Sequence, residues 1–261
     1  MNLIGLLGEQ NSGKSYLAQW LYRTRGYLPL AFADRMKTYA QAAFGIDPEL
    51  LWGPSELRGA PLQHSEEAWL AAWKRFPEVA RGLLVDVIGF AKDKPNRWGA
   101  AYVGLSDHWC FCKKLANDDY VSPRIILQTL GTEWGRALSP DLWWKLLYQK
   151  AIPSLLSRSP SPYLSQVPSV QILSQEKGIS SVMGFVVPDH RFRNEVEATR
   201  SLGGKVYRLL SFGEPTTTGV VNHASEIEAS QVPEELAPVL RIPRFTSDEE
   251  ADAFLSPLFP V

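Results

Sequence analysis

Apolar residues fall into two patterns along this chain, and together they predict an α/β protein. Short continuous apolar runs, typical of strands buried in a parallel sheet, alternate with stretches in which apolar residues return at helical spacing. The runs predict strands at residues 3–7, 28–32, 182–187, 205–210 and 239–242. The periodic stretches predict helices at residues 15–24, 35–44, 47–53, 65–76, 122–138, 141–157, 195–202 and 248–255.

Polar residues mark several ends of these elements. Ser122 before Pro123 is typical of a helix start, because a serine hydroxyl caps the first amides and proline fits the first turn. The pair Gly203-Gly204 is typical of a helix end. The aromatic residues of 65–76 recur on one helical face, which we interpret as a packing face rather than a ligand site.

Other parts of the chain have no clear period. Residues 55–59 form a polar loop, and 157–169, rich in Ser and Pro, predict a second loop. Residues 83–90 fit either a helix or a strand, whereas 92–120 mix charges, tryptophans and glycine, which indicates an insertion or a lid. We expect a single domain over 1–261, with insertions near 60–120 and 157–178.

The stretch between the first strand and the first helix carries a phosphate-binding motif. Residues 8–15 read GEQNSGKS, which fits the pattern G-x-x-x-x-G-K-[ST], although a Gly- and Ser-containing turn also matches it by chance. In the motif, backbone N–H groups and the helix end attract phosphates, Lys14 bridges the β- and γ-phosphates, and Ser15 holds Mg²⁺. The candidate nucleotide-binding residues are Gly8, Asn11, Ser12, Gly13, Lys14, Ser15 and Tyr16.

Charged residues follow two of the predicted strands. Asp34 and Lys37 come after the second strand, and Asp189 and Arg191 after the third. Open α/β sheets bind ligands at the carboxyl ends of their strands, so these side chains are candidates for a nucleotide site. Asp34 is a helix N-cap in the alternative interpretation, and the two roles are compatible. We expect Asp189 to hold Mg²⁺ or water, and Arg191 to contact a phosphate rather than stand as a surface charge.

One predicted helix has an unusual second face, which consists of Arg124, Gln128, Gly131 and Gly135. Glycine inside a helix costs about 1 kcal/mol relative to alanine, so two glycines need a reason. A flat base or sugar lying against the helix is one explanation, and close packing of another element is the other. In the first case Gln128 would bind a base edge, and Arg124 or Arg136 a phosphate.

The composition limits the class of protein. The chain has 261 residues, 45% of them hydrophobic, and its 27 basic and 28 acidic residues give a net charge of −1. This balance predicts no broad surface for nucleic acid, and no segment has the form of a membrane span or a signal, so we expect a cytoplasmic protein. Cys110 and Cys112 are interpreted as structural thiols, because no second pair completes a zinc site.

Four segments together resemble the phage-type deoxynucleoside monophosphate kinases of the P-loop NMP kinase superfamily. They are GEQNSGKS at 8–15, AFADRMK at 31–37, SPRIILQTLGTEWGR at 122–136 with SPDLWWK soon after, and PDHRFRNEVEATRSLGG at 188–204; HASE at 223–226 is similar to a further element. The matches follow the family's order over most of the chain. The segments at 122–136 and 188–204 are far more specific than the phosphate loop.

The resemblance implies a three-layer α/β/α P-loop kinase fold with a central parallel sheet and helical insertions that bind the acceptor or form lids. It implies transfer of the ATP γ-phosphoryl group to a 5′-dNMP, with Mg²⁺ as the metal. The reaction would take place in the cytoplasm, which is the host cytoplasm for a bacteriophage protein. A homodimer is common in such kinases. It implies catalytic roles for Lys14, Asp34, Asp189 and Arg191, metal binding by Ser15 and Asp189, and acceptor contacts by Asp34, Lys37, Arg124, Gln128, Thr132, Arg136, Arg191 and Glu195. Many members carry Asp where this chain has Ser15, so no acidic role transfers there.

Two other functions fit the phosphate loop. A related P-loop kinase would act on another small acceptor, such as dephospho-coenzyme A. A nucleotide-binding switch or DNA-packaging ATPase would instead need a guanine-reading N-K-x-D motif or an arginine finger between subunits. The sequence has no N-K-x-D motif, and its near-neutral charge argues against a DNA motor.

Overall fold

The computed structural model describes residues 2–9, 12–54, 56–62, 71, 121–136, 139–157, 164–176, 182–210 and 224–260. The chain divides into two compact units, the first made of Met1–Leu30 and Ser180–Val261 and the second of Ala31–Ile179. The single kinase domain with insertions stays a prediction. The two cysteines and the elements predicted within 65–120 lie outside the described residues, apart from Ala71.

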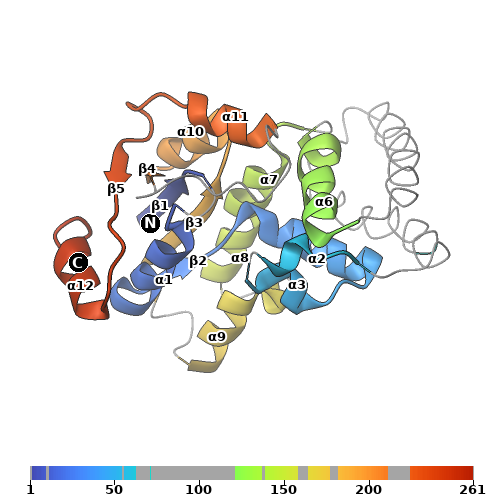
Figure 1. The fold of residues 1–261 in the computed structure, drawn as a ribbon, viewed down its shortest axis with the longest axis horizontal. Helices are drawn as coiled ribbons and strands as arrows, with labels where there is room; N and C mark the ends of the chain where they lie inside the picture. Colours follow the sequence, from blue (N-terminus) through green and yellow to red (C-terminus); the bar gives the residue numbers. More distant parts are fainter. Residues whose placement is uncertain are drawn as a thin grey trace. The chain divides into compact units, whose positions relative to one another are not determined.

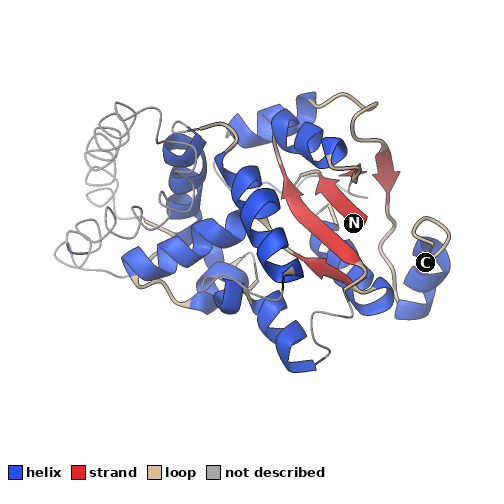
Figure 2. Ribbon diagram, turned by 180° about the vertical axis from the view of Figure 1, so that it is seen from behind, coloured by secondary structure: helices blue, strands red, loops and turns tan. Residues whose placement is uncertain are grey.

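The first unit is built on a five-stranded sheet in which every strand pairing is parallel. Its strands are β1 (Asn2–Leu7), β2 (Tyr27–Pro29), β3 (Gly184–His190), β4 (Lys205–Leu210) and β5 (Val239–Arg241), in the spatial order β2-β3-β1-β4-β5. The continuous apolar run of β1 fits its central position, because both faces of a central strand are covered. Figures 1 and 2 show β1 and β3 among the helices of this unit and β5 at its margin.

Helices cover both faces of this sheet, as Figure 1 shows. The described helices of the first unit are α1 (Lys14–Arg25), α10 (Arg193–Ser201), α11 (Ala224–Gln231) and α12 (Asp248–Leu255). On one face Leu17 of α1 and Leu255 of α12 share a core with Ile4 of β1. On the other face Val196 of α10 packs with Leu7 and with the residues that follow α11. The predicted three-layer α/β/α fold is therefore confirmed.

Two predicted strand ends were wrong. Residues 28–32 were expected to be one strand, but β2 ends at Pro29 and Phe32 begins helix α2. The Asp34 carboxylate accepts a hydrogen bond from the Ala31 amide at 2.7 Å, which starts the helix at that point. The third strand was expected to end before Pro188, but β3 continues to His190, whose buried ring is hydrogen-bonded inside the unit.

The regular elements that the structure describes in the second unit are all helices or helical turns. Its elements are α2 (Phe32–Phe44), α3 (Pro48–Trp52), α6 (Pro123–Gln128), α7 (Leu142–Lys145), α8 (Ile152–Leu156) and α9 (Pro168–Glu176), the 3₁₀ turns η1 (Leu57–Gly59) and η5 (Leu164–Gln166), and the π-helical segments η3 (Thr129–Arg136) and η4 (Leu146–Ala151). The predicted helix start is confirmed, since the Ser122 hydroxyl accepts from the Ile125 amide at 3.3 Å. The predicted loops 55–59 and 157–169 were partly wrong, because they contain η1, η5 and the start of α9.

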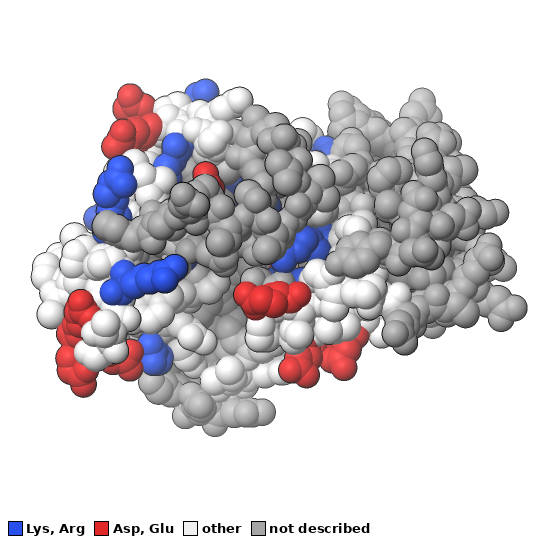
Figure 3. All heavy atoms as spheres, viewed as in Figure 1, with Lys and Arg blue, Asp and Glu red and all other residues white. Residues whose placement is uncertain are grey.

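The described surface carries charges of both signs. Figure 3 shows basic and acidic side chains dispersed over the face viewed, with acidic side chains gathered at its lower left. Asp248, Glu249 and Glu250 occupy the first turn of α12, where negative charge stabilises the positive helix end. None of the helices that the structure describes is both long and apolar enough to cross a lipid bilayer.

Candidate functional site

The predicted phosphate loop begins where β1 ends, next to the end of β3. The two strands are paired, with Leu7 opposite His190. The chain leaves β1 for α1 on one face of the sheet and leaves β3 for α10 on the other face. Neighbouring parallel strands whose connections part in this way form a topological switch point, where open α/β sheets bind ligands. The first unit therefore brings the start of the loop and Asp189 to the carboxyl ends of two neighbouring strands, β1 and β3.

The two glycines of the loop are required by its backbone. Gly8 has a φ of 149°, and a Cβ there would overlap the carbonyl oxygen of Leu209 on β4. Gly13 has a φ of 87° and forms the N-cap of α1 in the left-handed conformation. Both φ values are strained for any residue with a side chain. Glycine is therefore favoured at both positions, and Gly13 leads directly into the N-terminus of α1, whose first amides attract anions.

The ammonium of Lys14 lies over this loop. Its Nζ donates to the carbonyl oxygen of Gly8 at 2.7 Å, to that of Glu9, and to the hydroxyl of the buried Ser12 at 3.2 Å. The positive charge of Lys14 therefore lies beside Gly8, Glu9 and Ser12, close to the start of α1. Such an arrangement can bind a phosphate chain through backbone amides and one cation.

The remaining predicted nucleotide-binding residues occupy the first turn of α1 or precede it. Ser15 and Tyr16 are exposed there, and the Tyr16 ring lies 5.7 Å from the ring of Phe245. The loss of part of the hydration of the phenol and, after it, the negative charge of the Asp248 carboxylate raise the pKa of Tyr16. Both side chains are thus accessible to a ligand from solvent. Asn11 lies outside the described residues.

The end of β3 presents Asp189 and Arg191 on either side of a buried histidine. Asp189 is half-buried and Arg191 is exposed, whereas His190 has no exposed surface. The His190 ring contacts the Val187 carbonyl oxygen through Nδ1 at 3.1 Å and the Thr199 hydroxyl through Nε2 at 2.7 Å. Burial lowers the pKa of His190 to about 4, so the ring is neutral at pH 7. This anchor, which the sequence did not predict, fixes the backbone between the two candidate site residues.

Glu195 has a structural function that the sequence did not predict. Its Oε2 accepts hydrogen bonds from the backbone amides of Arg191 at 2.9 Å and Phe192 at 3.1 Å, and the residue is 4% exposed. These bonds cap the start of α10 and hold the Arg191 backbone. Arg193 makes a surface ion pair with Glu197 at 2.7 Å. The phosphate contact of Arg191 stays a prediction from the sequence.

The oxygen donors predicted for a metal are one hydroxyl, that of Ser15, and one carboxylate, that of Asp189. Among the described residues, no group of three or more His, Cys, Asp or Glu side chains could hold a metal. Mg²⁺ is usually bound in phosphoryl-transfer sites by one or two protein oxygens together with substrate phosphates and water. The Ser15 hydroxyl and the Asp189 carboxylate fit this donor set.

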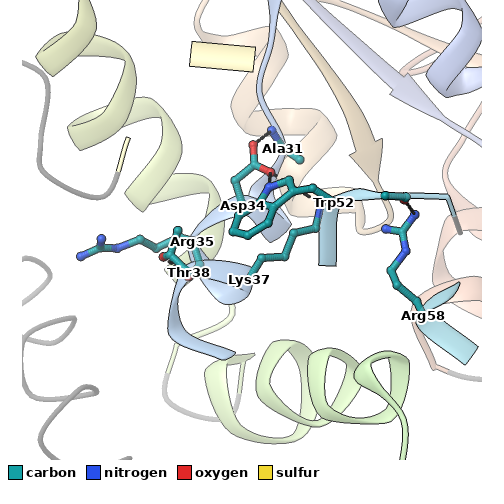
Figure 4. Close-up of polar contacts among 8 residues, drawn as sticks. Ala31, Asp34, Arg35, Lys37, Thr38, Trp52 and Arg58 are labelled. Carbon is teal, nitrogen blue, oxygen red and sulfur yellow. Dashed lines mark hydrogen bonds and ion pairs between the residues drawn. The ribbon is translucent and has the colours of Figure 1, made fainter. Parts of the chain in front are cut away.

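Asp34 and Lys37, predicted beside a strand end, meet Trp52 in the second unit. The Asp34 Oδ1 accepts from the Trp52 indole Nε1 at 3.1 Å and lies 3.7 Å from the Lys37 Nζ. The interpretation of Asp34 as the N-cap was wrong, because Ala31 is the N-cap and Asp34 stands three residues inside α2. Figure 4 shows Lys37 extending along the Trp52 ring, while Arg35 points away from Asp34.

The face of Arg124, Gln128, Gly131 and Gly135 serves close packing at both glycines. A Cβ at Gly131 would lie 2.8 Å from the Met36 sulfur, and a Cβ at Gly135 would overlap the Trp143 ring. The Trp143 indole also donates to the Gly131 carbonyl oxygen at 2.8 Å. Of the two explanations for these glycines, the structure therefore supports close packing, since protein side chains fill the space beside both of them.

The polar residues of the same segment are partly accessible. Of the eight side chains predicted to contact the acceptor, this segment carries four, and all of them are half-buried: Arg124, Gln128, Thr132 and Arg136. The Arg136 guanidinium donates to the Pro140 carbonyl oxygen at 3.0 Å, which ties the end of η3 to the turn before α7. Helix α6 packs on α2, so these residues belong to the same unit as Asp34 and Lys37.

Comparison with known proteins gives one informative likeness. The chain is 31% identical over 75 residues to a protein of Acanthamoeba polyphaga mimivirus named "Putative deoxynucleotide monophosphate kinase". The aligned part is 29% of this chain and 37% of the mimivirus protein, so it covers about a third of that relative. No protein-family model matches the chain.

Proposed function

We propose that the chain is a deoxynucleoside monophosphate kinase, which transfers the γ-phosphoryl group of ATP to a 5′-dNMP and releases ADP and a dNDP. The observation that carries the proposal is the phosphate loop at the switch point between β1 and β3, with Lys14 over it. The name of the mimivirus relative and the four family-like segments support a nucleoside monophosphate as the acceptor.

The donor nucleotide is proposed to bind at the loop of the first unit. Lys14 exchanges the carbonyl oxygens of Gly8 and Glu9 for phosphate oxygens of ATP, which are stronger, charged acceptors. The loop amides and the first turn of α1 hold the phosphate chain. The residues proposed for this ATP site are Gly8, Asn11, Ser12, Gly13, Lys14, Ser15 and Tyr16.

Charge that develops on the transferred phosphoryl group needs positive partners. Arg191, exposed directly after β3, is proposed to contact that group, and the Glu195 carboxylate holds the backbone from which Arg191 extends. Ser15 and Asp189 would hold Mg²⁺, which neutralises phosphate charge when bound. Lys14 and Arg191 would then supply the protein's own positive charges.

The acceptor is proposed to bind in the second unit. Arg124 or Arg136 would contact the 5′-phosphate and Gln128 the base edge, with Thr132 on the same segment. The acceptor oxygen belongs to a phosphate that is already ionised at neutral pH, so the reaction requires no general base. We therefore assign Asp34 the task of holding Lys37 in place, since its carboxylate already accepts from Ala31 and Trp52.

The test is direct detection of products with the purified chain. It is incubated with ATP, Mg²⁺ and each dNMP or NMP in turn, and the nucleotides are separated by chromatography; one further reaction contains dephospho-coenzyme A. The proposal expects a dNDP to form in equal amount to ADP with at least one dNMP. Phosphorylation of dephospho-coenzyme A instead, or release of ADP and phosphate without any dNDP, would overturn it.

A further inference from the structure

Trp52 joins two charged residues of a different helix. Its indole Nε1 donates to the Asp34 Oδ1 at 3.1 Å, and the Lys37 Nζ lies 5.6 Å from the centre of its ring. Asp34 and Lys37 are i and i+3 on α2, whereas Trp52 is the last residue of α3. The indole thus ties the start of α2 to the end of α3, as Figure 4 shows.

The charges at this tie are largely removed from water. The side chains of Asp34 and Lys37 are each 11% exposed. A buried charge is stable only where its hydrogen bonds are satisfied, and here the carboxylate accepts from Ala31 through Oδ2 and from Trp52 through Oδ1. The Trp52 N–H therefore helps to fix the direction of the carboxylate, and the carboxylate helps to fix the Lys37 ammonium.

The position of Trp52 is itself set by bonds within its own short segment. The Asp47 carboxylate caps the start of α3 by accepting from the Glu49 amide at 2.8 Å. At the other end, the Gly53 amide donates to the Glu49 carbonyl oxygen at 2.8 Å. The Arg58 guanidinium reaches the Gly53 carbonyl oxygen at 3.5 Å. The indole is consequently presented by a closed helical turn and not by an open loop.

We propose that Trp52 is a positioning residue for the acceptor nucleotide, which acts by holding the Asp34 carboxylate and the Lys37 ammonium in the geometry that binds the acceptor phosphate. The inference rests on the kinase function proposed above and deepens its acceptor site. Lys37 supplies a positive charge for the phosphate in addition to that of Arg124 or Arg136, and Trp52 and Asp34 hold the Lys37 ammonium in place. Trp52 itself is not expected to contact the transferred group.

The test is the variant Trp52→Phe, which keeps an aromatic ring beside Lys37 and removes the N–H group that donates a hydrogen bond to Asp34. We expect the KM for the dNMP to rise about 10-fold, with the KM for ATP within about 2-fold of the parent, because one hydrogen bond to a charged group is lost at the acceptor side alone. Trp52→His, which retains a ring N–H, should recover part of the dNMP affinity. Circular dichroism establishes that each variant is folded.

Trp20 offers a matched control. Its indole donates to the Asp252 Oδ1 at 2.6 Å, and the Arg25 guanidinium lies 4.8 Å from its ring centre, so Trp20→Phe removes the same kind of bond inside the first unit. It should lower the melting temperature without a selective change in the KM for the dNMP. Equal changes of both KM values in Trp52→Phe, no change in either, or a dNMP-selective change in Trp20→Phe would each overturn the inference. If the parent chain forms no dNDP, the proposed function falls instead, and the inference falls with it.

Discussion

The Nε2 atom of His190 lies 2.7 Å from the hydroxyl oxygen of Thr199, in the interior of the first unit. Gly5 of the neighbouring strand leaves the space for the ring, since a Cβ there would lie 2.6 Å from the His190 Cε1. A ring held in this way stays neutral, because burial disfavours its charged form. Protonation of His190 must therefore compete with folding.

This relationship predicts that the free energy of unfolding falls as the solution becomes acidic. The pKa of His190 is about 4 in the folded chain against 6.5 for an ordinary histidine, so between these values the unfolded chain binds more protons. The stabilisation is complete above pH 6.5 and is lost progressively as the pH falls towards 4, by about 3 kcal/mol in total. Urea unfolding across this range, compared with His190→Asn, measures it. An unchanged pH slope in the variant would contradict the prediction.

Lys14→Ala is expected to remove activity and leave the fold intact. The ammonium donates to Gly8, Glu9 and Ser12 of its own loop, so we expect the sheet to form without it. Without the Lys14 ammonium, the negative charge of the phosphates lacks a positive partner, which should lower kcat by about 100-fold or more. Initial rates and a thermal melt check the two halves. A large fall in melting temperature would instead make Lys14 a structural residue.

Gln128→Ala is expected to weaken the acceptor and spare the donor. The amide is half-buried on α6, where we propose that it binds the base edge. Its loss should raise the KM for the dNMP about 10-fold and change the KM for ATP little. The reason is that a base edge without its hydrogen-bond partner weakens the binding of the dNMP alone. Initial-rate kinetics with each substrate varied in turn provide the measurement. Equal effects on both substrates would remove Gln128 from the acceptor site.

Gly135→Ala is expected to destabilise the chain although alanine favours helices. Its Cβ would overlap the ring of Trp143, which is 3% exposed and hydrogen-bonded to the Gly131 carbonyl oxygen, so we expect a loss of about 1–3 kcal/mol. Gly131→Ala should cost less, because its Cβ would meet the flexible end of Met36. Gly59→Ala, with open space at the Cβ, is the control. Chemical denaturation ranks the three, and equal stabilities would contradict the packing argument.

Much of the fold was predictable because local signals agreed with the tertiary structure. The run at 3–7 became β1, and the cap at Ser122 began a helix, since each signal acts within a few residues. Phe32 was misassigned because the apolar run 28–32 shows no break, and the decisive bond joins Ala31 to Asp34. An acidic residue three positions after a possible helix start was the signal that could have corrected it.

The candidate site was predictable only where a motif lies in one stretch of chain. The glycines and the lysine of the motif lie within seven consecutive positions, 8–14, so their spacing alone predicted a helix start at the end of the motif, and α1 begins at Lys14. The bond between Trp52 and Asp34 spans 18 residues and two helices, and no periodicity encodes it. The buried state of His190 was equally hidden, because it depends on a glycine of another strand.

The order of the strands has a consequence for how the chain is made. In the sheet, β3 lies between β1 and β2, and β4 lies on the other side of β1. Neither of the two strands that leave the ribosome first can therefore find a hydrogen-bonding neighbour until residues 184–190 have been translated. Residues 31–179, which form the second unit, emerge in the meantime, so the sheet of the first unit can be completed only after the second unit has been synthesised.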